Sequence, residues 1–361
     1  MVKLIFMRRP TSLPLLAVLV AVMLAPLRLS ADLVWTPESG WKVQGGVLAS
    51  LQGEEGRNAL ELMNKARAAE EAGEDGRALK AYTQVTKKYP NSVYAAEALF
   101  RTGLIQQKQR KYHKAFQTYQ VLVAGYPNSE KFNQVIGEQY RIASDLAEGK
   151  RAKTVWWLPG FRSRERAIAY FETIVMTAPF SDYAPLALMN AARGYKKMNE
   201  TPAAIDALDR MISTYPRNVL TPDAYLRIAE THASLVDGPA YDQASTQDAI
   251  TYYEDYMILF PGHNGMVAAE SGLADMKSVL ARSKMVIGDY YYKHRKNYKA
   301  AKVFYNEAIT AYPDSAVATE AREKLTVVDA KLEEQAKVTP PDGSGPPKPA
   351  PAKKTKRFWI F

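Results

Sequence analysis

The chain has 361 residues, of which 24% are charged and none is cysteine. The absence of cysteine excludes disulfides, thiolate metal sites and a cysteine nucleophile, and we expect no lipid-modified N-terminal cysteine of the kind found in bacterial lipoproteins. The formal net charge is +10, but residues 1–31 and the residues from 339 onward contribute +4 each, which leaves +2 for residues 32–338. A nearly neutral body argues against nucleic-acid binding.

Residues 1–31 have the pattern of a signal peptide. Lys3, Arg8 and Arg9 form a positive segment, Leu13 to Leu27 is apolar, and Leu29-Ser30-Ala31 is a plausible cleavage site. The apolar stretch is about 15 residues long, which is short for a membrane span. We therefore predict export across the inner membrane, with a retained anchor as the alternative.

Residues 32–56 come next and predict an extended N-terminal arm. Apolar residues alternate along it, and a proline and a glycine separate its two halves. We expect its tryptophans to pack on the rest of the protein or on a partner, and an ordinary structural strap is the alternative. The residues concerned are Leu33, Trp35, Trp41 and Val43, with Pro37 and Gly40 between them.

Residues 57–336 contain one pattern six times: an alanine, a bulky residue four positions on, an apolar residue three further, and a proline five beyond that. The first three positions share one stripe of an α-helix, and the proline ends that helix. This is the second helix of a tetratricopeptide repeat (TPR), in which the alanine permits close helix packing. The six instances are Ala78/Tyr82/Val85/Pro90, Ala115/Tyr119/Leu122/Pro127, Ala167/Phe171/Ile174/Pro179, Ala204/Leu208/Met211/Pro216, Ala249/Tyr253/Tyr256/Pro261 and Ala301/Tyr305/Ala308/Pro313.

The repeats predict an all-α, right-handed TPR solenoid of about six helix pairs. In the first helices Gly103, Gly137 and Gly288 fall where a small residue is needed. The prolines lie 37, 52, 37, 45 and 52 residues apart, against a period of 34. Loops are therefore inserted, and we place them at 149–163, which contains WWLPG, and at 235–247. Residues 316–336 form an amphipathic helix that is expected to cap the last repeat.

The inner wall of a TPR groove is built from first-helix side chains. We expect the N-terminal repeats to present a mixed apolar and polar wall that accepts an extended peptide, with an arginine meeting a carboxylate. The alternative is that Phe100 and Leu104 belong to the core between repeats. The candidate partner-binding residues are Met63, Arg67, Phe100, Leu104, Gln107, Glu138 and Arg141.

Residues 337–361 are rich in proline and lysine, which predicts a disordered tail with an aromatic end. We expect this end to dock on a protein or to make weak, salt-sensitive contact with a membrane surface, and a passive tail is the alternative. The docking candidates are Lys353, Lys354, Lys356, Arg357, Phe358, Trp359 and Phe361.

Catalytic and metal-binding patterns are missing from the sequence. The four histidines lie far apart, none in a metal-ligand spacing, and we expect them to be solvated residues of turns. Acidic pairs such as Glu70/Glu71 lie on charged helix faces. We therefore predict no cofactor, no metal and no enzymatic activity.

Two stretches narrow the TPR class further. Residues 276–315 (MKSVLARSKMVIGDYYYKHRKNYKAAKVFYNEAITAYPDS) and the first two repeats, with AGEDGRALKAYTQVTKKYPNS and RKYHKAFQTYQVLVAGYPNS, resemble the BamD family. Members of that family are TPR scaffolds of the outer-membrane β-barrel assembly machinery. The resemblance covers roughly residues 58–336. The chain departs from the family in lacking the lipobox cysteine and in carrying the WWLPG insertion and the aromatic tail.

The resemblance implies a periplasmic scaffold at the inner face of the outer membrane. Its N-terminal repeats would receive unfolded barrel precursors, and its C-terminal repeats would hold the barrel-assembly subunit. A general periplasmic TPR adaptor for cell-envelope or cell-wall proteins is the alternative, and a TPR regulatory domain of an exported enzyme is a third reading.

Overall fold

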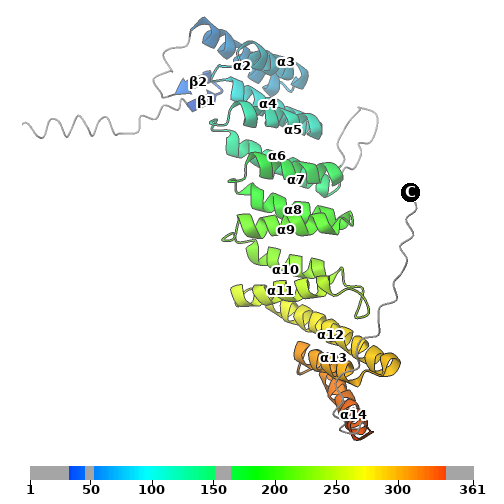
Figure 1. Cartoon of the computed structure of the whole chain (residues 1–361). Coiled ribbons are helices and arrows are strands. Elements are labelled where there is room, and N and C mark those ends of the chain that lie inside the picture. Colours follow the sequence, from blue (N-terminus) through cyan, green and yellow to red (C-terminus); the bar gives the residue numbers. More distant parts are fainter. Residues whose placement is uncertain (1–31, 45–52, 151–163, 339–361) are drawn as a thin grey trace, which may run out of the picture. The chain divides into compact units, whose positions relative to one another are not determined.

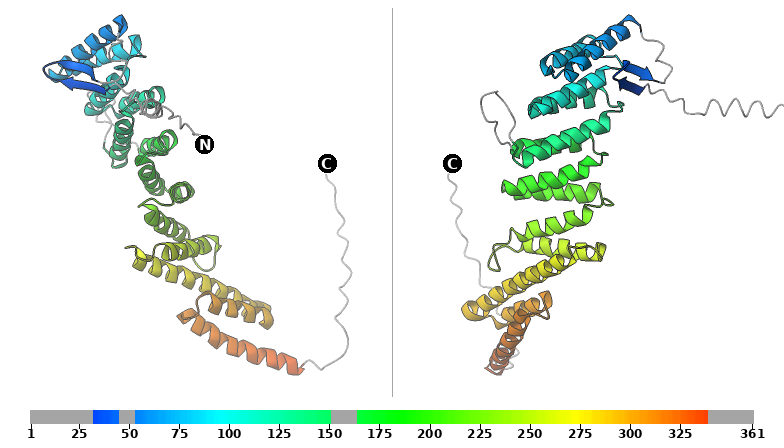
Figure 2. Two further views of the ribbon diagram at one scale, coloured as in Figure 1. Left: turned by 90° about the vertical axis from the view of Figure 1, so that its left-hand side faces the viewer. Right: turned by 180° about the vertical axis from the view of Figure 1, so that it is seen from behind.

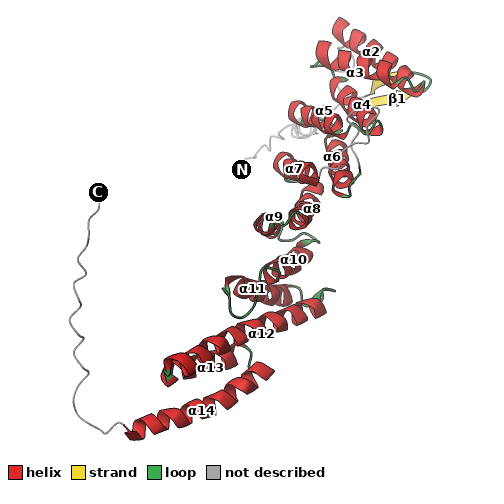
Figure 3. Cartoon of the chain, turned by 90° about the vertical axis from the view of Figure 1, so that its right-hand side faces the viewer, coloured by secondary structure: helices red, strands yellow, loops and turns green. Residues whose placement is uncertain are grey.

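The structure is a computed structural model that describes residues 32–44, 53–150 and 164–338. The predicted signal peptide (1–31), the WWLPG segment and the aromatic tail with its docking candidates lie outside the described residues. Within the described ranges the protein is built from α-helices, apart from one short π-helix and a single β-hairpin (Figure 3). The expected all-α TPR fold is confirmed.

The chain forms two compact units, residues 1–198 and 199–361. The first contains a β-hairpin and helices α2 to α8, and the second contains α9 to α14 (Figure 1). The elements are β1 (Asp32–Thr36), β2 (Gly40–Gln44), α2 (Glu54–Glu71), α3 (Asp75–Lys88), α4 (Ala95–Lys108), α5 (Tyr112–Gly125), α6 (Phe132–Ala147), α7 (Arg164–Thr177), α8 (Tyr183–Lys197), α9 (Thr201–Thr214), α10 (Thr221–Ala233), α11 (Ala244–Leu259), α12 (Met266–Tyr290), the π-helix η2 (Tyr291–Arg295), α13 (Tyr298–Ala311) and α14 (Ala316–Val338).

The repeat pattern explains both where the second helices end and what they bury. Each of α3, α5, α7, α9, α11 and α13 ends two residues before its proline, because the residue preceding a proline is pushed out of the helical region. All eighteen residues of the stripe, the six alanines among them, are buried. Burying several such side chains per repeat is the main source of its stability, since one helix pair alone could not cover its apolar face.

Glycines of the first helices make room for rings. Gly103 of α4 faces Tyr119 of its partner helix α5, and Gly288 of α12 faces Tyr305 of its partner helix α13. Gly137 of α6 differs, because the ring against it is Tyr183 of α8, in the next repeat. Its role is therefore to pack one repeat on the next.

The turns after the prolines differ from the sequence-based expectation in their hydrogen bonds. The Asn and Ser residues there predict side-chain caps for the following helices, but α4, α6 and α10 begin without one. In the turn before α4, the backbone N–H of Ser92 donates to the carbonyl of Tyr89. Ser129 Oγ and Asn218 Oδ1 instead accept the N–H groups of Lys131 and Leu220, which precede α6 and α10. Before α14 the predicted cap does form, where Ser315 Oγ accepts the N–H of Ala318 at 3.1 Å.

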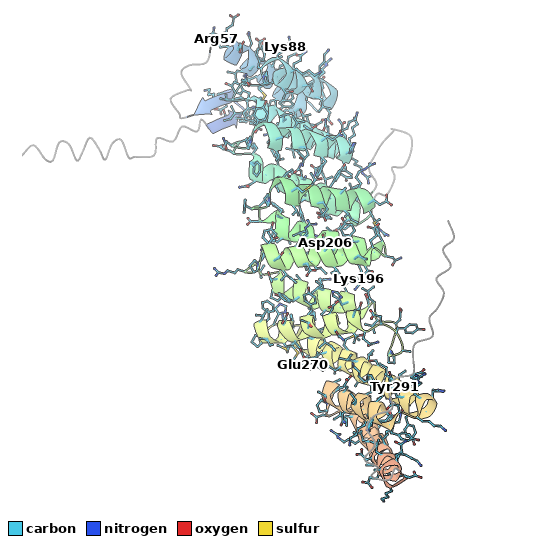
Figure 4. The ribbon with its side chains drawn as sticks, in the orientation of Figure 1. Arg57, Lys88, Lys196, Asp206, Glu270 and Tyr291 are labelled. Carbon is cyan, nitrogen blue, oxygen red and sulfur yellow. The ribbon has the colours of Figure 1, made fainter. Side chains whose placement is uncertain are left out.

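Length variation falls between the first and second helices of a repeat. The insertion at 149–163 separates α6 from α7, and the loop after Leu235 separates α10 from α11. In the sixth repeat the first helix itself is long, with 25 residues in α12, and continues into η2. Tyr291, labelled in Figure 4, begins η2 and packs with Tyr292 on the core, while Tyr290 is half exposed.

The predicted capping helix is present as α14. It packs against α13 and buries four apolar side chains on the last repeat, so the final helix pair does not end in an open apolar face. The buried residues are Val317, Ala318, Ala321 and Val328.

Candidate partner-binding site

The N-terminal arm contains a β-hairpin that lies against α2 and α4 (Figure 2). Strands β1 and β2 pair antiparallel, with Trp35 opposite Trp41. A loop of three residues joins the strands, and Gly40 takes the left-handed conformation (φ +68°) that such loops require. Leu33, Trp35 and Trp41 share one face of the hairpin, and this face packs on the helices.

Trp41 anchors the hairpin. Its side chain is 3% exposed and joins the core of the first repeat together with Met63 and Ala98. Its backbone N–H donates to Asn64 Oδ1 at 2.9 Å. Gly40 also approaches Asn64 closely, since a Cβ at position 40 would lie 2.7 Å from the same oxygen.

A network of charges surrounds the docked tryptophans. The Arg67 guanidinium lies 4.4 Å from the centre of the Trp35 ring, and that of Arg101 lies 5.6 Å from the Trp41 ring. Glu70 and Glu71 pair with Arg67, and Arg101 pairs with Glu70 and with Glu97, as described next. Both guanidiniums are therefore held in place over indole rings, a favourable cation–π arrangement.

Glu97 of α4 is a buried carboxylate with two cationic partners. It is 3% exposed, accepts a hydrogen bond from Arg101 Nε at 2.8 Å, and lies 3.5 Å from Lys131 Nζ. Burial alone would lower the pKa of Arg101, but the hydrogen bond to Glu97 and the charges of Glu97 and Glu70 raise it. The Arg101 guanidinium therefore stays charged beside Glu97.

An open groove of about 520 Å³ lies beside this network on the first helices of the second to fourth repeats. Its walls are aromatic and polar, and Arg141 is 57% exposed on its side chain while it pairs with Glu138. Tyr140 packs on Tyr183, with ring centres 5.4 Å apart, and its hydroxyl accepts a hydrogen bond from Asn190 Nδ2. The lining residues are Phe100, Gln134, Gly137, Glu138, Tyr140, Arg141, Ser144 and Tyr183.

The structure brings together three of the seven predicted partner-binding residues. Phe100, Glu138 and Arg141 line the groove. Phe100 is also 9% exposed and packs in the core, so its core role is confirmed and its partner-binding role stays a prediction. An aromatic floor beside an exposed guanidinium suits an extended peptide that carries an aromatic side chain and a carboxylate.

The other four predicted residues lie elsewhere. Met63 is fully buried beneath the hairpin, and Arg67 is paired with Glu70 and Glu71 beside Trp35. Leu104 packs on the core, and Gln107 is buried, where its Oε1 accepts the Tyr119 hydroxyl at 3.1 Å. None of these four side chains is among the lining residues of the groove.

Five lining residues of the groove were not among the predicted partner-binding residues, namely Gln134, Gly137, Tyr140, Ser144 and Tyr183. Tyr183 is the one that comes from the next repeat. It lies four residues after Pro179, the same offset that places Tyr94 after Pro90. The recurrence of a tyrosine at this offset is a signal that a first helix begins with a ring packed against the preceding repeat. Tyr94, just before α4, is buried in the core beneath the hairpin, whereas Tyr183 is partly buried.

The histidines agree only in part with the expected solvated turn residues, because His113 and His294 are exposed whereas His232 and His263 are partly buried. His113 Nδ1 lies 2.8 Å from the Tyr170 hydroxyl, and His263 Nδ1 lies 2.7 Å from that of Tyr256. His232 stacks on Tyr252. Burial raises the pKa of Tyr170 to about 12, so its hydroxyl stays protonated.

Neither metal-binding nor membrane-spanning features emerge from the described ranges. Among those residues, no three His, Asp or Glu side chains gather in a way that would hold a metal ion. Within the same residues, no helix combines the length and the apolar character needed to cross a bilayer.

Comparison with known proteins shows what the chain resembles. Residues 162–339 match the YfiO family, described as an outer membrane lipoprotein, and residues 62–92 and 97–129 match a tetratricopeptide repeat family. The groove residues on α4 and α6 therefore lie outside the YfiO match, within or next to the general repeat.

Two relatives carry the name outer membrane protein assembly factor BamD. The one from Caulobacter vibrioides is 25% identical over 128 residues, which span 36% of this chain and 42% of the relative. The one from Rickettsia prowazekii is 26% identical over 161 residues, which span 45% of this chain and 64% of the relative. The chain thus aligns with less than two thirds of either protein.

A solved tetratricopeptide repeat protein from Parabacteroides merdae is 14% identical, covers 76% of this chain and 99% of its own, and has a TM-score of 0.31. That likeness is too weak to bear on the arrangement of the repeats. The match of residues 162–339, the repeats at 62–129 and the two BamD relatives agree with one another, and the chain is a BamD-like tetratricopeptide repeat protein.

Proposed function

We propose that this protein is a periplasmic TPR scaffold that supports assembly and insertion of outer-membrane β-barrel proteins, at the inner face of the outer membrane. The observation that carries the proposal is the match of residues 162–339, which includes the whole second unit up to α14, to a family of outer membrane lipoproteins. The two relatives named as assembly factors support the same role.

The two units would divide the work. The groove of the first unit, on α4, α6 and α8, would receive unfolded outer-membrane protein precursors. The second unit would hold the barrel-assembly subunit. This division follows the resemblance to BamD-like scaffolds, and the open aromatic groove supports its first half.

The chemistry of the groove fits the end of a barrel strand. Strands of outer-membrane barrels alternate apolar and polar residues and carry aromatic side chains near the membrane interfaces. An aromatic side chain would pack on Phe100 and Tyr140, and a C-terminal carboxylate would reach the exposed guanidinium of Arg141, whose present partner Glu138 is partly buried.

A peptide-binding experiment tests the groove. We expect Arg141→Glu to weaken binding of a fluorescent peptide that ends in the last strand of a barrel precursor by about tenfold, since one charge-assisted contact is lost and a like charge is added. Arg217→Glu, in an exposed turn of the second unit, is the matched control for net charge. Equal affinity in both variants would refute the assignment of the groove.

A pull-down from envelope extracts separates the scaffold from its alternative, a general periplasmic TPR adaptor for cell-envelope or cell-wall proteins. The scaffold predicts co-purification of a barrel-forming outer-membrane protein, and depletion of the protein should reduce assembled barrels. Recovery of cell-wall proteins without any barrel component would favour the adaptor.

A further inference from the structure

The surface that the hairpin covers is built by helices that do not need the hairpin to form a repeat. Helix α2 packs on α3, and α4 packs on α5, as in the later repeats. The hairpin adds Trp41 to this pair of first helices, over Met63 and Ala98. A TPR uses this wall of first helices for binding, so the hairpin sits where a ligand would sit.

The contacts at this surface recognise an extended segment with aromatic side chains. Asn64 Oδ1 accepts a main-chain N–H, a contact that is independent of the side chain attached to that residue. Arg67 and Arg101 each place a guanidinium over an indole ring. One backbone contact and two ring contacts therefore define the fit.

The hairpin fills this surface imperfectly. The Trp41 Nε1 atom is buried and finds no hydrogen-bond partner in the part of the chain that the structure describes. A buried donor left unpaired costs about 1–3 kcal/mol, so a phenylalanine in the same place would avoid this penalty. A two-stranded hairpin is also marginally stable by itself in water. Both features favour exchange of the hairpin for another segment.

The surface also continues into the groove. Arg101, which lies over Trp41, binds Glu97, and Glu97 pairs with Lys131. Lys131 Nζ in turn lies 5.6 Å from the centre of the Phe100 ring in the groove. Glu97 and its two cationic partners thus link the surface under the hairpin to the groove.

We propose that the surface formed by α2 and α4 is a second binding site, specific for amphipathic β-segments with aromatic side chains, which residues 32–44 occupy until a ligand displaces them. The identity of the ligand as a barrel-precursor strand rests on the proposed function. The apolar face of the hairpin, with Leu33, Trp35 and Trp41, has the same alternation as a barrel strand.

Intrinsic fluorescence of the full chain reports the displacement. The protein has five tryptophans, so replacing Trp156, Trp157 and Trp359 by Phe leaves Trp35 and Trp41 as the only ones. The probe is a tryptophan-free, fluorescein-labelled peptide of the last strand of a barrel precursor, whose binding is followed by anisotropy. We expect binding to shift the tryptophan emission to longer wavelength, because Trp41 moves into water.

Variants of the hairpin test the competition in the full chain. Trp41→Ala should bind the precursor peptide about tenfold more tightly, since the competing segment is weakened. Lys42→Ala, at an exposed position of the same strand, is the matched control and should bind like the parent. Where Trp41→Ala lowers the helical signal in circular dichroism, Gly40→Ala replaces it, because a Cβ there would meet Asn64 and strain a left-handed residue.

A second probe separates this site from the proposed function. A synthetic peptide of residues 32–44 should bind the Trp41→Ala chain in trans, and the same peptide with Trp41→Ala should not. If the precursor peptide fails to bind while the peptide of residues 32–44 binds, the precursor is the wrong ligand but the site stands. If the precursor binds with unchanged emission and equal affinity in all variants, the hairpin is a permanent strap and the second site is refuted.

Discussion

The ring of Tyr119 fills the space in which a side chain of Gly103 would lie. A Cβ added to Gly103 would approach Tyr119 Cε1 to 2.1 Å, and the neighbouring ring atoms to 2.6 and 2.7 Å. Tyr119 itself is fully buried, and its hydroxyl donates to Gln107. The ring cannot retreat, so helices α4 and α5 would have to separate to admit even a methyl group.

We therefore expect Gly103→Ala to lower the free energy of unfolding by about 1–3 kcal/mol, the usual effect of overpacking. Urea unfolding followed by circular dichroism measures it. Gly125→Ala is the control, because Gly125 ends α5 and a Cβ there meets nothing within 4 Å. That substitution should stabilise the protein by about 0.4–1 kcal/mol, and a loss in both variants would contradict the packing account.

The repeat alanines predict a second overpacking effect. Ala301 and Ala167 are completely buried, so Ala301→Leu or Ala167→Leu should destabilise the protein by about 1–3 kcal/mol. Val303 lies on the same helix as Ala301 but is 54% exposed. As the control, Val303→Leu should therefore change the free energy of unfolding by less than about 0.5 kcal/mol. Thermal melts of the three variants test this ranking.

Arg67 and Arg141 are both predicted from the sequence to bind a partner, but replacing each by glutamate should affect stability differently. Arg67 is held by Glu70 and Glu71 beside Trp35, so Arg67→Glu would gather three acids there and release the ring. We expect a loss of about 1–3 kcal/mol, against less than about 0.5 kcal/mol for the exposed Arg141→Glu. Equal melting temperatures in the two variants would contradict the paired role of Arg67.

Asp289 predicts a dependence of stability on pH in the second unit. Burial would raise the pKa of Asp289, but hydrogen bonds from Lys324 and Tyr305 and the charges of Lys324 and Lys293 outweigh it and lower the pKa. A carboxyl whose pKa is lower in the folded state stabilises the fold above its ordinary pKa, near 4, and this contribution is lost as the pH falls through the folded value.

We thus expect the free energy of unfolding to fall below about pH 4, and to fall less steeply in Asp289→Asn. Urea unfolding between pH 3 and 7 provides the comparison. Glu320, whose pKa is lowered by hydrogen bonds from Lys324 and Arg282 against the effect of burial, contributes in the same direction, so the slope is reduced but does not vanish. An identical slope in the variant would refute the role of Asp289.

The repeats were predictable because one physical rule acts six times. A small residue, a bulky residue, an apolar residue and a proline recur wherever a second helix packs and ends, and this spacing is visible in the sequence. The hairpin was only partly predictable. Its alternating residues and Gly40 predict two extended halves. The burial of the Trp41 side chain, however, depends on α2 and α4, which are distant in the sequence.

The groove was predictable in part for the same reason. Glu138 and Arg141 lie on one face of α6, so helical periodicity places them together. Tyr183 joins them from α8. Its offset from Pro179 marks it as a packing residue, but its place in the groove depends on how one repeat packs on the next. Arg67 is of a residue type that often binds carboxylates, so the sequence suggests a binding role. That it is instead paired with Glu70 and Glu71 beside the hairpin is evident only from the structure.

The loop between α10 and α11 has a practical consequence. The Gln243 side chain donates to the carbonyls of Gly238 and Tyr241 and so closes the loop upon itself, just before α11 begins. Helices α10 and α11 on either side of the loop pack through Ala229, Ala249, Tyr253 and Tyr256, while Tyr241 in the loop is 66% exposed. The loop tip is therefore a permissive insertion point, at which an epitope or a fluorescent reporter can be carried without shifting the register of α10 on α11.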